Sequence, residues 1–287
     1  MKILNGKEVS QNIKDNVKEM INVLKNKGLR APKLAVIIVG ENQASQRYVR
    51  NKEKACEYTG IESEIIKLPE TILDIDLLHE VERLNNDSTV DGILVQLPLP
   101  KHINEDLIIT SISPEKDVDG FHPINVAGMT LGFEGALLPC TPAGIYELLN
   151  HYKYNVEGKH VVIIGKSNIV GKPAAIMAMN KNATVTVCHK KTENIKEICK
   201  TADILISAAG VAKLVNSDYI KEGCIVIDVG INMDENNKLC GDVDFEDVKD
   251  KVEAITPVPG GIGPMTIAML MVNTLKAYIR RDWLYEV

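Results

Sequence analysis

"VVIIGKSNIVGKP", residues 161–173, sets the fold class, because it joins an apolar strand to a helix through a glycine-containing turn. The apolar run before Gly165 is typical of a strand buried in a parallel sheet. Gly165 permits a tight turn, Gly171 lets the backbone approach a ligand, and Pro173 suits the first helical turn. Free N–H groups at the helix start favour an anion there. The stretch predicts a Rossmann-type nucleotide site, although it is not G-x-G-x-x-G and an ordinary strand-to-helix turn remains the alternative.

Strand and helix patterns alternate on both sides of this stretch, which predicts α/β architecture with parallel sheets. Strands are predicted at 33–40, 63–68, 90–100, 183–189, 202–210, 223–230 and 252–258. Helices are predicted over 9–24, from before Tyr48 to Gly60, and over 71–85, 141–152 and 263 onward. We therefore expect two domains. Residues 1–140 with 266–287 form an N-terminal α/β catalytic domain onto which the last helix packs back, and residues 141–265 form a C-terminal Rossmann-type domain.

The composition excludes several classes of function. The chain of 287 residues is 45% hydrophobic and 25% charged, which is typical of a soluble globular protein. Its net charge of −6 argues against nucleic acid as a partner. No apolar run is expected to span a membrane, and the polar N-terminus is not a secretory signal, so we expect a cytoplasmic protein. The six cysteines form no C-x-x-C pair and predict reduced, mostly buried thiols, and the scattered histidines predict no catalytic metal.

The strand after the glycine turn ends in "CHKKT", residues 188–192. An NAD site usually carries Asp or Glu at this place, to hold the ribose 2′-hydroxyl. Here Lys190 and Lys191 stand there, and Lys166 adds a third positive charge in the turn. This pattern predicts NADP, unless the three lysines are merely solvated. Further along, "IDVGIN" places Ile231 where it could touch the nicotinamide, although an isoleucine is more often part of a core.

Four other segments contain candidate functional residues. In "YVRNKEKACEYTG", 48–60, Tyr48 and Lys52 share one helical face, so Lys52 is either an acid–base group or a solvated lysine. "VQLPLP", 95–100, carries Gln96 at a strand end, and "SPEKDVDGFHPIN", 113–125, holds Asp117 and Asp119 in a turn. "TPVPGGIGPMT", 256–266, could bring backbone close to a ligand. Each segment taken singly has an ordinary structural explanation.

Taken together, five elements resemble one family closely, the bifunctional methylenetetrahydrofolate dehydrogenase/cyclohydrolases. They are Y-V-x-x-K at 48–52, V-Q-L-P-L-P at 95–100, P-E-K-D-V-D-G at 114–120, G-K-S-x-x-V-G-x-P at 165–173 and P-V-P-G-G-I-G-P-M-T at 257–266. They occur in the family's order, and the resemblance covers essentially the whole chain.

The resemblance implies oxidation of 5,10-methylenetetrahydrofolate to the methenyl form with NADP⁺, followed by hydrolysis to 10-formyltetrahydrofolate, in one-carbon metabolism and purine biosynthesis. It implies a homodimer formed through the Rossmann domain.

The resemblance also implies roles for individual residues. Lys52 matches the catalytic lysine, Tyr48 the residue stacked on the substrate, Gln96 the partner of the lysine, and Asp117 the aspartate that holds the pterin. Implied substrate contacts also include Val95, Leu97, Pro257, Pro259, Gly260, Gly261, Gly263 and Pro264. Implied cofactor contacts are Gly165, Lys166, Ser167, Ile169, Val170, Gly171, His189, Lys190 and Ile231. Many members have serine at the position of Lys190, and the added positive charge here should strengthen binding of the 2′-phosphate.

Two other classes of function remain open at this stage. A two-domain NADP dehydrogenase of the shikimate type also uses a lysine in its substrate domain, but it has no reason to carry "VQLPLP" or "PVPGGIGPMT". A non-catalytic NADP-sensing module would not need Tyr48, Lys52, Gln96 and Asp117. The measured substrate, and whether any folate is turned over, separates these three functions.

Overall fold

The structure, a computed structural model, describes residues 1–283, which form two compact units. Unit 1 comprises Met1–Ser10 and Thr141–Thr266, and unit 2 comprises Gln11–Cys140 and the chain from Ile267 onward. The expected fold class is confirmed, since both units are α/β and the last helix belongs mainly to unit 2. The first ten residues group with unit 1 rather than with the N-terminal domain, and the predicted domain boundaries remain a proposal.

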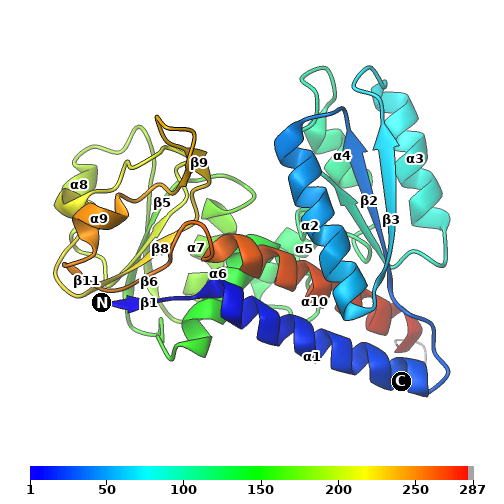
Figure 1. The fold of residues 1–287 in the computed structure, drawn as a ribbon, viewed down its shortest axis with the longest axis horizontal. Coiled ribbons are helices and arrows are strands. Elements are labelled where there is room, and N and C mark those ends of the chain that lie inside the picture. The colour runs from blue at the N-terminus through cyan, green and yellow to red at the C-terminus, as the bar shows by residue number, and fades with distance from the viewer. Residues whose placement is uncertain (284–287) are drawn as a thin grey trace. The chain divides into compact units, whose positions relative to one another are not determined.

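Unit 2 is built on a three-stranded parallel sheet of order β3-β2-β4 (Figure 1). The strands are β2 Lys33–Val39, β3 Glu62–Leu68 and β4 Gly92–Val95. The helices are α1 Gly6–Asn26, whose first residues lie in unit 1, α2 Gln43–Thr59, α3 Asp74–Asn86, α4 Glu105–Ser111, α5 Pro123–Leu131 and α10 Ile262–Trp283, which starts in unit 1.

Side-chain alternation along β2 produces the layers of unit 2. Leu34, Val36 and Ile38 lie in a core cluster with residues of α1, α2 and α10. Ala35, Ile37 and Val39 lie in a second cluster with residues of α3 and α4. Successive side chains of a strand point to opposite faces, so a continuous apolar run fills both faces and requires helices on each.

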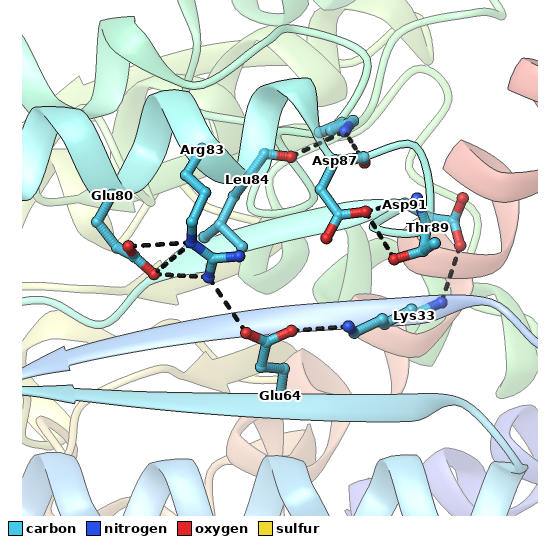
Figure 2. A network of polar contacts seen from close by, with 9 residues as sticks. Lys33, Glu64, Glu80, Arg83, Leu84, Asp87, Thr89 and Asp91 are labelled. Carbon is cyan, nitrogen blue, oxygen red and sulfur yellow. Dashed lines mark hydrogen bonds and ion pairs between the residues drawn. The ribbon is translucent and has the colours of Figure 1, made fainter.

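Polar contacts tie the strands of this sheet to α3, as Figure 2 shows. Glu64 on β3 pairs with Lys33 on β2 at 2.7 Å and with Arg83 on α3 at 3.2 Å. Asp91, just before β4, is buried and accepts the backbone N–H of Lys33 at 2.8 Å and two bonds from Arg30. The exposed pairs contribute little each, whereas a buried, multiply bonded carboxylate fixes where β4 starts.

Unit 1 contains a six-stranded sheet of order β1-β11-β8-β7-β5-β6 (Figure 1). Its strands are β1 Lys2–Ile3, β5 His160–Ile164, β6 Thr184–Cys188, β7 Ile204–Ser207, β8 Cys224–Asp228 and β11 Val252–Ile255, all paired in parallel. A small antiparallel pair joins β9 Asn232–Met233 to β10 Leu239–Cys240. The helices are α6 Cys140–His151, α7 Gly171–Asn180, α8 Ile195–Cys199 and α9 Phe245–Val248, with a 3₁₀ turn at Ser217–Tyr219.

The strand order of unit 1 indicates where a ligand crevice is expected in its sheet. The chain runs from β5 to β6 on one side and returns to β7 on the other, so the order reverses at β5. In doubly wound sheets, ligands bind at such a switch point, beyond the carboxyl ends of the strands. The loops that leave β5, β6 and β8 begin at Gly165, His189 and Val229. The strand β1 is an element that the sequence patterns do not predict.

Two sequence expectations concern burial and length. The stretch Ile262–Arg281 of α10 is long and apolar enough to cross a membrane, which corrects the expectation that no run reaches that length. Half of this stretch is buried within the fold, as in the core helix of a globular domain. The cysteines are free thiols; five are buried and Cys240 is partly exposed, which confirms the predicted burial.

Candidate active site

Lys52 lies on the buried face of α2. Ser45, Val49, Cys56 and Thr59 recur at helical spacing and are each 5% exposed or less, and Lys52 occupies the same stripe at 8% exposure. A lysine is almost never buried to this extent unless a specific contact holds it. The position therefore excludes the solvated-lysine interpretation of the sequence pattern.

Gln96 meets the amine of Lys52. The Nζ of Lys52 donates to Oε1 of Gln96 at 3.0 Å, and Nε2 of Gln96 donates to the carbonyl of Leu97 at 2.7 Å. The second bond fixes which end of the amide faces the lysine. Gln96 follows β4 directly, and its backbone N–H donates to the carbonyl of Ile37 on β2 at 2.8 Å. The sheet therefore sets the position of the amide that holds the lysine.

Tyr48 precedes Lys52 by one helical turn and is half-buried. Burial raises the pKa of its phenol, and the nearby Arg47 opposes that shift. The ring therefore lies partly within unit 2 and can cover a flat ligand group beside the amine. The structure thus brings Tyr48, Lys52 and Gln96 together in one unit.

Lys116 anchors the loop that carries the two aspartates. Its buried Nζ donates to the carbonyls of Leu84, Asn85 and Asp87 at 2.8–2.9 Å, at the end of α3. A cation is favoured there because the last carbonyls of a helix carry partial negative charge. Burial lowers the pKa of this amine, and Arg281 lowers it further. The contact sets the position of residues 117–119 against the sheet.

Asp117 is placed differently from the sequence interpretation. It is 2% exposed, and its Oδ2 accepts the backbone N–H of His122 at 2.8 Å and Nδ2 of Asn125 at 2.9 Å. A carboxylate used in this way closes the loop and has little surface left for a ligand. Asp117 therefore fastens the segment to the start of α5, which argues against its role as the pterin-holding carboxylate.

Asp119, two residues further along, is coupled to the lysine by charge. Burial raises the pKa of its carboxyl to about 6, while the positive charge of Lys52 acts in the opposite direction. Its side chain keeps partial exposure, unlike that of Asp117. Sequence reasoning placed Asp119 in the turn without a role. No sequence pattern separates the two aspartates, because the contacts that distinguish them come from His122 and Asn125.

The pH dependence of the free energy of unfolding should reveal the titration of the Asp119 carboxyl. A raised pKa means that the folded state binds the proton more tightly, so the contribution of Asp119 to the free energy of unfolding falls as pH rises from about 4 to about 6. Asp119→Asn removes this loss. We expect its unfolding free energy, relative to the wild type, to rise by about 2 kcal/mol over that window, as followed by urea unfolding. Asp76→Asn, at an exposed carboxylate of α3, is the control, and an equal slope in both variants would contradict the assignment.

The remaining predicted substrate contacts differ in burial and in the unit to which they belong. Val95 is 5% exposed and lies in the core cluster shared with α3 and α4, so it supports the strand rather than contacting a ligand. Leu97 is partly exposed next to Gln96. The segment Pro257–Pro264 belongs to unit 1, and its role toward a substrate remains a prediction.

The nucleotide site in unit 1 depends on two glycines. Gly165 has a φ of +119°, and a Cβ on it would collide with the carbonyl oxygen of Ala208. A Cβ on Gly171 would collide with the carbonyl oxygen of Gly165. The turn after β5 is therefore packed backbone against backbone, and only glycine fits at either place. This close packing sets the backbone of the turn that leads into the first residues of α7.

The turn itself is held by Ser167. Its Oγ accepts the backbone N–H of Val170 at 3.2 Å and that of Gly171 at 3.4 Å. Lys166, Ser167 and Ile169 are exposed, and Val170 is partly exposed. These residues form the rim of the turn at the start of a ten-residue helix, where an anionic group is favoured.

The end of β6 supplies positive charge. His189 is partly exposed, and Lys190 and Lys191 are exposed. Among the ion pairs of the described residues, none joins Lys166, Lys190 or Lys191 to a carboxylate. The glycine turn has no room for a Cβ and can therefore lie close to a ligand. Together with these cations, it fits a dinucleotide that carries a 2′-phosphate. Ile231 is 51% exposed, so it is not a core residue and is free to contact an apolar ring.

Two buried aspartates that the sequence analysis did not single out shape the same edge. Asp242 accepts the backbone N–H groups of Ala209, Gly210 and Val211 at 2.6–3.1 Å. Asp228 accepts that of Gly230 at 2.9 Å, and burial raises its pKa to about 6. The two carboxylates fasten the loops after β7 and β8. Because the contacts of Asp242 join segments far apart in the chain, no local pattern reveals them.

The fold and these two sites define a two-domain, nicotinamide-nucleotide-dependent dehydrogenase with a buried lysine in unit 2. Two family models match the chain: the tetrahydrofolate dehydrogenase/cyclohydrolase catalytic domain over residues 4–119 and its NAD(P)-binding domain over residues 139–282. The chain belongs to the tetrahydrofolate dehydrogenase/cyclohydrolase family.

Individual relatives agree with this membership. The chain is 54% identical over 281 residues to the bifunctional protein FolD of Listeria innocua, covering 98% of each chain. A crystal structure of FolD from Campylobacter jejuni is 54% identical with a TM-score of 0.96, covering 98% of this chain and 99% of that one. The Trypanosoma brucei enzyme, complexed with NADP and an inhibitor, is 37% identical with a TM-score of 0.94, covering 98% of each chain. A shikimate dehydrogenase from Thermus thermophilus, at 15% identity and a TM-score of 0.54 over 86% of this chain and 99% of that one, shares the fold alone.

Proposed function

We infer that this chain oxidises 5,10-methylenetetrahydrofolate to 5,10-methenyltetrahydrofolate with NADP⁺ and then hydrolyses the product to 10-formyltetrahydrofolate. The observation that best supports this function is Lys52, whose amine lies in the buried stripe of α2 and contacts Gln96, within the family's catalytic domain. A buried amine held by an oriented amide is the arrangement that proton transfer requires.

The oxidation requires alignment more than covalent chemistry. The bound NADP⁺ supplies the hydride acceptor. We propose that Gly165, Ser167 and Gly171 hold the pyrophosphate, that Lys190 contacts the 2′-phosphate, and that Ile231 contacts the nicotinamide. Tyr48 would stack on the aminobenzoyl ring and fix the substrate in unit 2. Two nitrogens flank the reacting carbon, and their lone pairs stabilise the cation that forms.

The hydrolysis requires proton movement, which assigns Lys52 its role. Water that attacks the methenyl carbon must lose a proton, and in our proposal the uncharged amine form of Lys52 accepts it at Nζ. The same proton can return to the ring nitrogen when its bond to the carbon breaks. Gln96 would hold the amine in one orientation, because its own amide is fixed by Leu97.

We propose that Asp119, rather than Asp117, holds the pterin. The partial exposure of Asp119 and its electrostatic coupling to Lys52 support this role. Asp117 accepts hydrogen bonds from His122 and Asn125 and would act by positioning the loop. The glycines and prolines of Pro257–Pro264 remain proposed substrate contacts.

A substrate comparison tests the proposed function directly. The purified protein is given NADP⁺ with either methylenetetrahydrofolate or shikimate, and the appearance of NADPH is followed by absorbance. We expect NADPH with the folate alone. Reduction with shikimate would favour the shikimate-type dehydrogenase, and NADP⁺ binding without turnover of any folate would favour the sensing module.

Preference for NADP⁺ over NAD⁺ should depend on Lys190. Its removal in Lys190→Ala takes one cation from the proposed 2′-phosphate contact, so the dissociation constant for NADP⁺ should rise about tenfold. The constant for NAD⁺ should change less than about twofold, because that cofactor has no 2′-phosphate. Isothermal titration calorimetry measures both constants. Lys181→Ala, at an exposed lysine of the same unit, is the control, and unchanged NADP⁺ affinity in Lys190→Ala would remove this residue from the site.

We also propose that the enzyme is a cytoplasmic homodimer associated through unit 1, as the family resemblance implies. Sedimentation equilibrium of the purified chain tests the assembly. A mass near twice 31.6 kDa is expected, and a mass equal to one chain at micromolar concentration would contradict it.

A further inference from the structure

A cavity lies in unit 2, and the residues of the lysine site do not line it. It has a volume of about 600 Å³ and lies between α5, the turn that follows it, and the C-terminal part of α10. Its lining includes Ile124, Gly128, Phe133, Ala136, Ala277 and Arg280. Tyr48, Lys52, Gln96 and Asp119 do not line it, so the proposed folate chemistry leaves it unassigned.

Small residues let the walls of the cavity approach one another closely. A Cβ on Gly128 would lie 3.0 Å from the Cβ of Ala136. The backbone of α5 at Gly128 therefore lies close to Ala136 on this side of the cavity. A Cβ on Gly135 would collide with the Nη2 of Arg280. The guanidinium therefore lies directly against the backbone of the turn, where a larger residue would displace it.

The cavity presents a cation, Arg280, that has no polar partner among the side chains described through residue 281. Arg280 is partly buried, and burial lowers the pKa of its guanidinium. Within residues 1–281, no hydrogen bond or ion pair involves this side chain. A guanidinium carries five N–H donors in a planar fork that matches a carboxylate. Desolvation without a partner is unfavourable, and an anion would relieve it.

The surrounding charges favour an anion as well. Arg281 also lines the cavity and pairs with the buried Asp91 at 3.1 Å. Lys276, one turn before Arg280 on the same helix, donates to the carbonyls of Glu134 and Ala136. Glu115 is the carboxylate in the lining; it is exposed and accepts from the hydroxyl of Ser113. Among the lining residues, the cations Arg280 and Arg281 therefore exceed the carboxylate of Glu115.

Apolar side chains supply the other half of the surface. Ile124 is 62% exposed and Phe133 is 63% exposed, and both line the cavity. An exposed phenylalanine beside an exposed isoleucine costs free energy in water, and a ligand with an apolar body would bury both.

We propose that this cavity binds a small organic anion, with its carboxylate on Arg280 and an aromatic body against Phe133 and Ile124. Its volume is within the range of small-molecule sites, and an apolar lining with a few polar or charged groups is their usual composition. The site is independent of the two proposed reactions.

Binding of a matched pair of probes tests this site. The enzyme, saturated with NADP⁺ so that the nucleotide site is filled, is titrated calorimetrically with 1-naphthoate and with the neutral 1-naphthamide. We expect naphthoate to bind at least about tenfold more tightly than naphthamide. Arg280→Met should remove this difference while naphthamide binds as before, and Arg280→Lys should keep part of it.

A second variant tests the apolar half. Phe133→Ala changes an exposed side chain, so the protein should fold normally, and both probes should bind about threefold to tenfold more weakly. Lys101→Ala, at an exposed lysine of the same unit, should leave both probes unchanged. Equal affinity of the wild type for the two probes, or naphthoate binding that survives Arg280→Met and Phe133→Ala, would overturn the proposal.

Discussion

The Lys52→Met variant is expected to lose cyclohydrolase activity by about 10²–10⁴-fold, the usual contribution of a positioned acid–base group. Methionine keeps most of the length of the side chain and suits the buried stripe of α2, so the fold should survive. Dehydrogenase activity should fall much less, because hydride transfer needs no proton from water. Decay of methenyltetrahydrofolate measures the first activity, and NADPH appearance measures the second.

Lys54→Met is the matched control, since Lys54 lies on the same helix but on its exposed face. It should keep both activities near those of the wild type. Equal loss of both activities in Lys52→Met, with an unchanged circular dichroism spectrum and melting temperature, would contradict the division of labour proposed for the lysine.

The Gly165→Ala variant should show the largest effect in unit 1. The substitution forces a Cβ onto a residue with a φ of +119° and into the carbonyl oxygen of Ala208. We expect a loss of about 2–4 kcal/mol in the free energy of unfolding, from backbone strain and steric overlap together. The turn should also open, and the dissociation constant for NADP⁺ should rise more than about tenfold. Urea unfolding and calorimetry measure the two effects.

Gly158→Ala separates strain from overlap. Gly158 also has a positive φ, of +69°, but a Cβ on it would meet no atom within 4 Å. This variant should lose about 1 kcal/mol and keep its affinity for NADP⁺. If Gly165→Ala were no more damaging than Gly158→Ala, the close packing of the turn would not control the nucleotide site.

The sequence predicts the architecture well because both periodicities are strong. The apolar run of β2 required helices on both faces, and the glycine turn after β5 indicated the nucleotide edge. These are local patterns, and the structure reproduces them.

The details of the site depend on contacts between distant residues. Nothing in α2 alone distinguishes a buried Lys52 from a solvated one, since its stripe also contains Ser45 and Thr59. Asp117 and Asp119 are equivalent in a sequence, and only the contacts of Asn125 and His122 separate them. The cavity beside Arg280 likewise needs α5 and α10, which are far apart in the chain.

The measurement that tests the central claim most directly is one coupled spectroscopic assay of the wild-type chain with methylenetetrahydrofolate and NADP⁺. Our account predicts that NADPH appears and that the methenyl intermediate forms and then decays faster than it does without enzyme. NADPH formation with methenyl decay at the uncatalysed rate would contradict the claim that a single chain carries both activities.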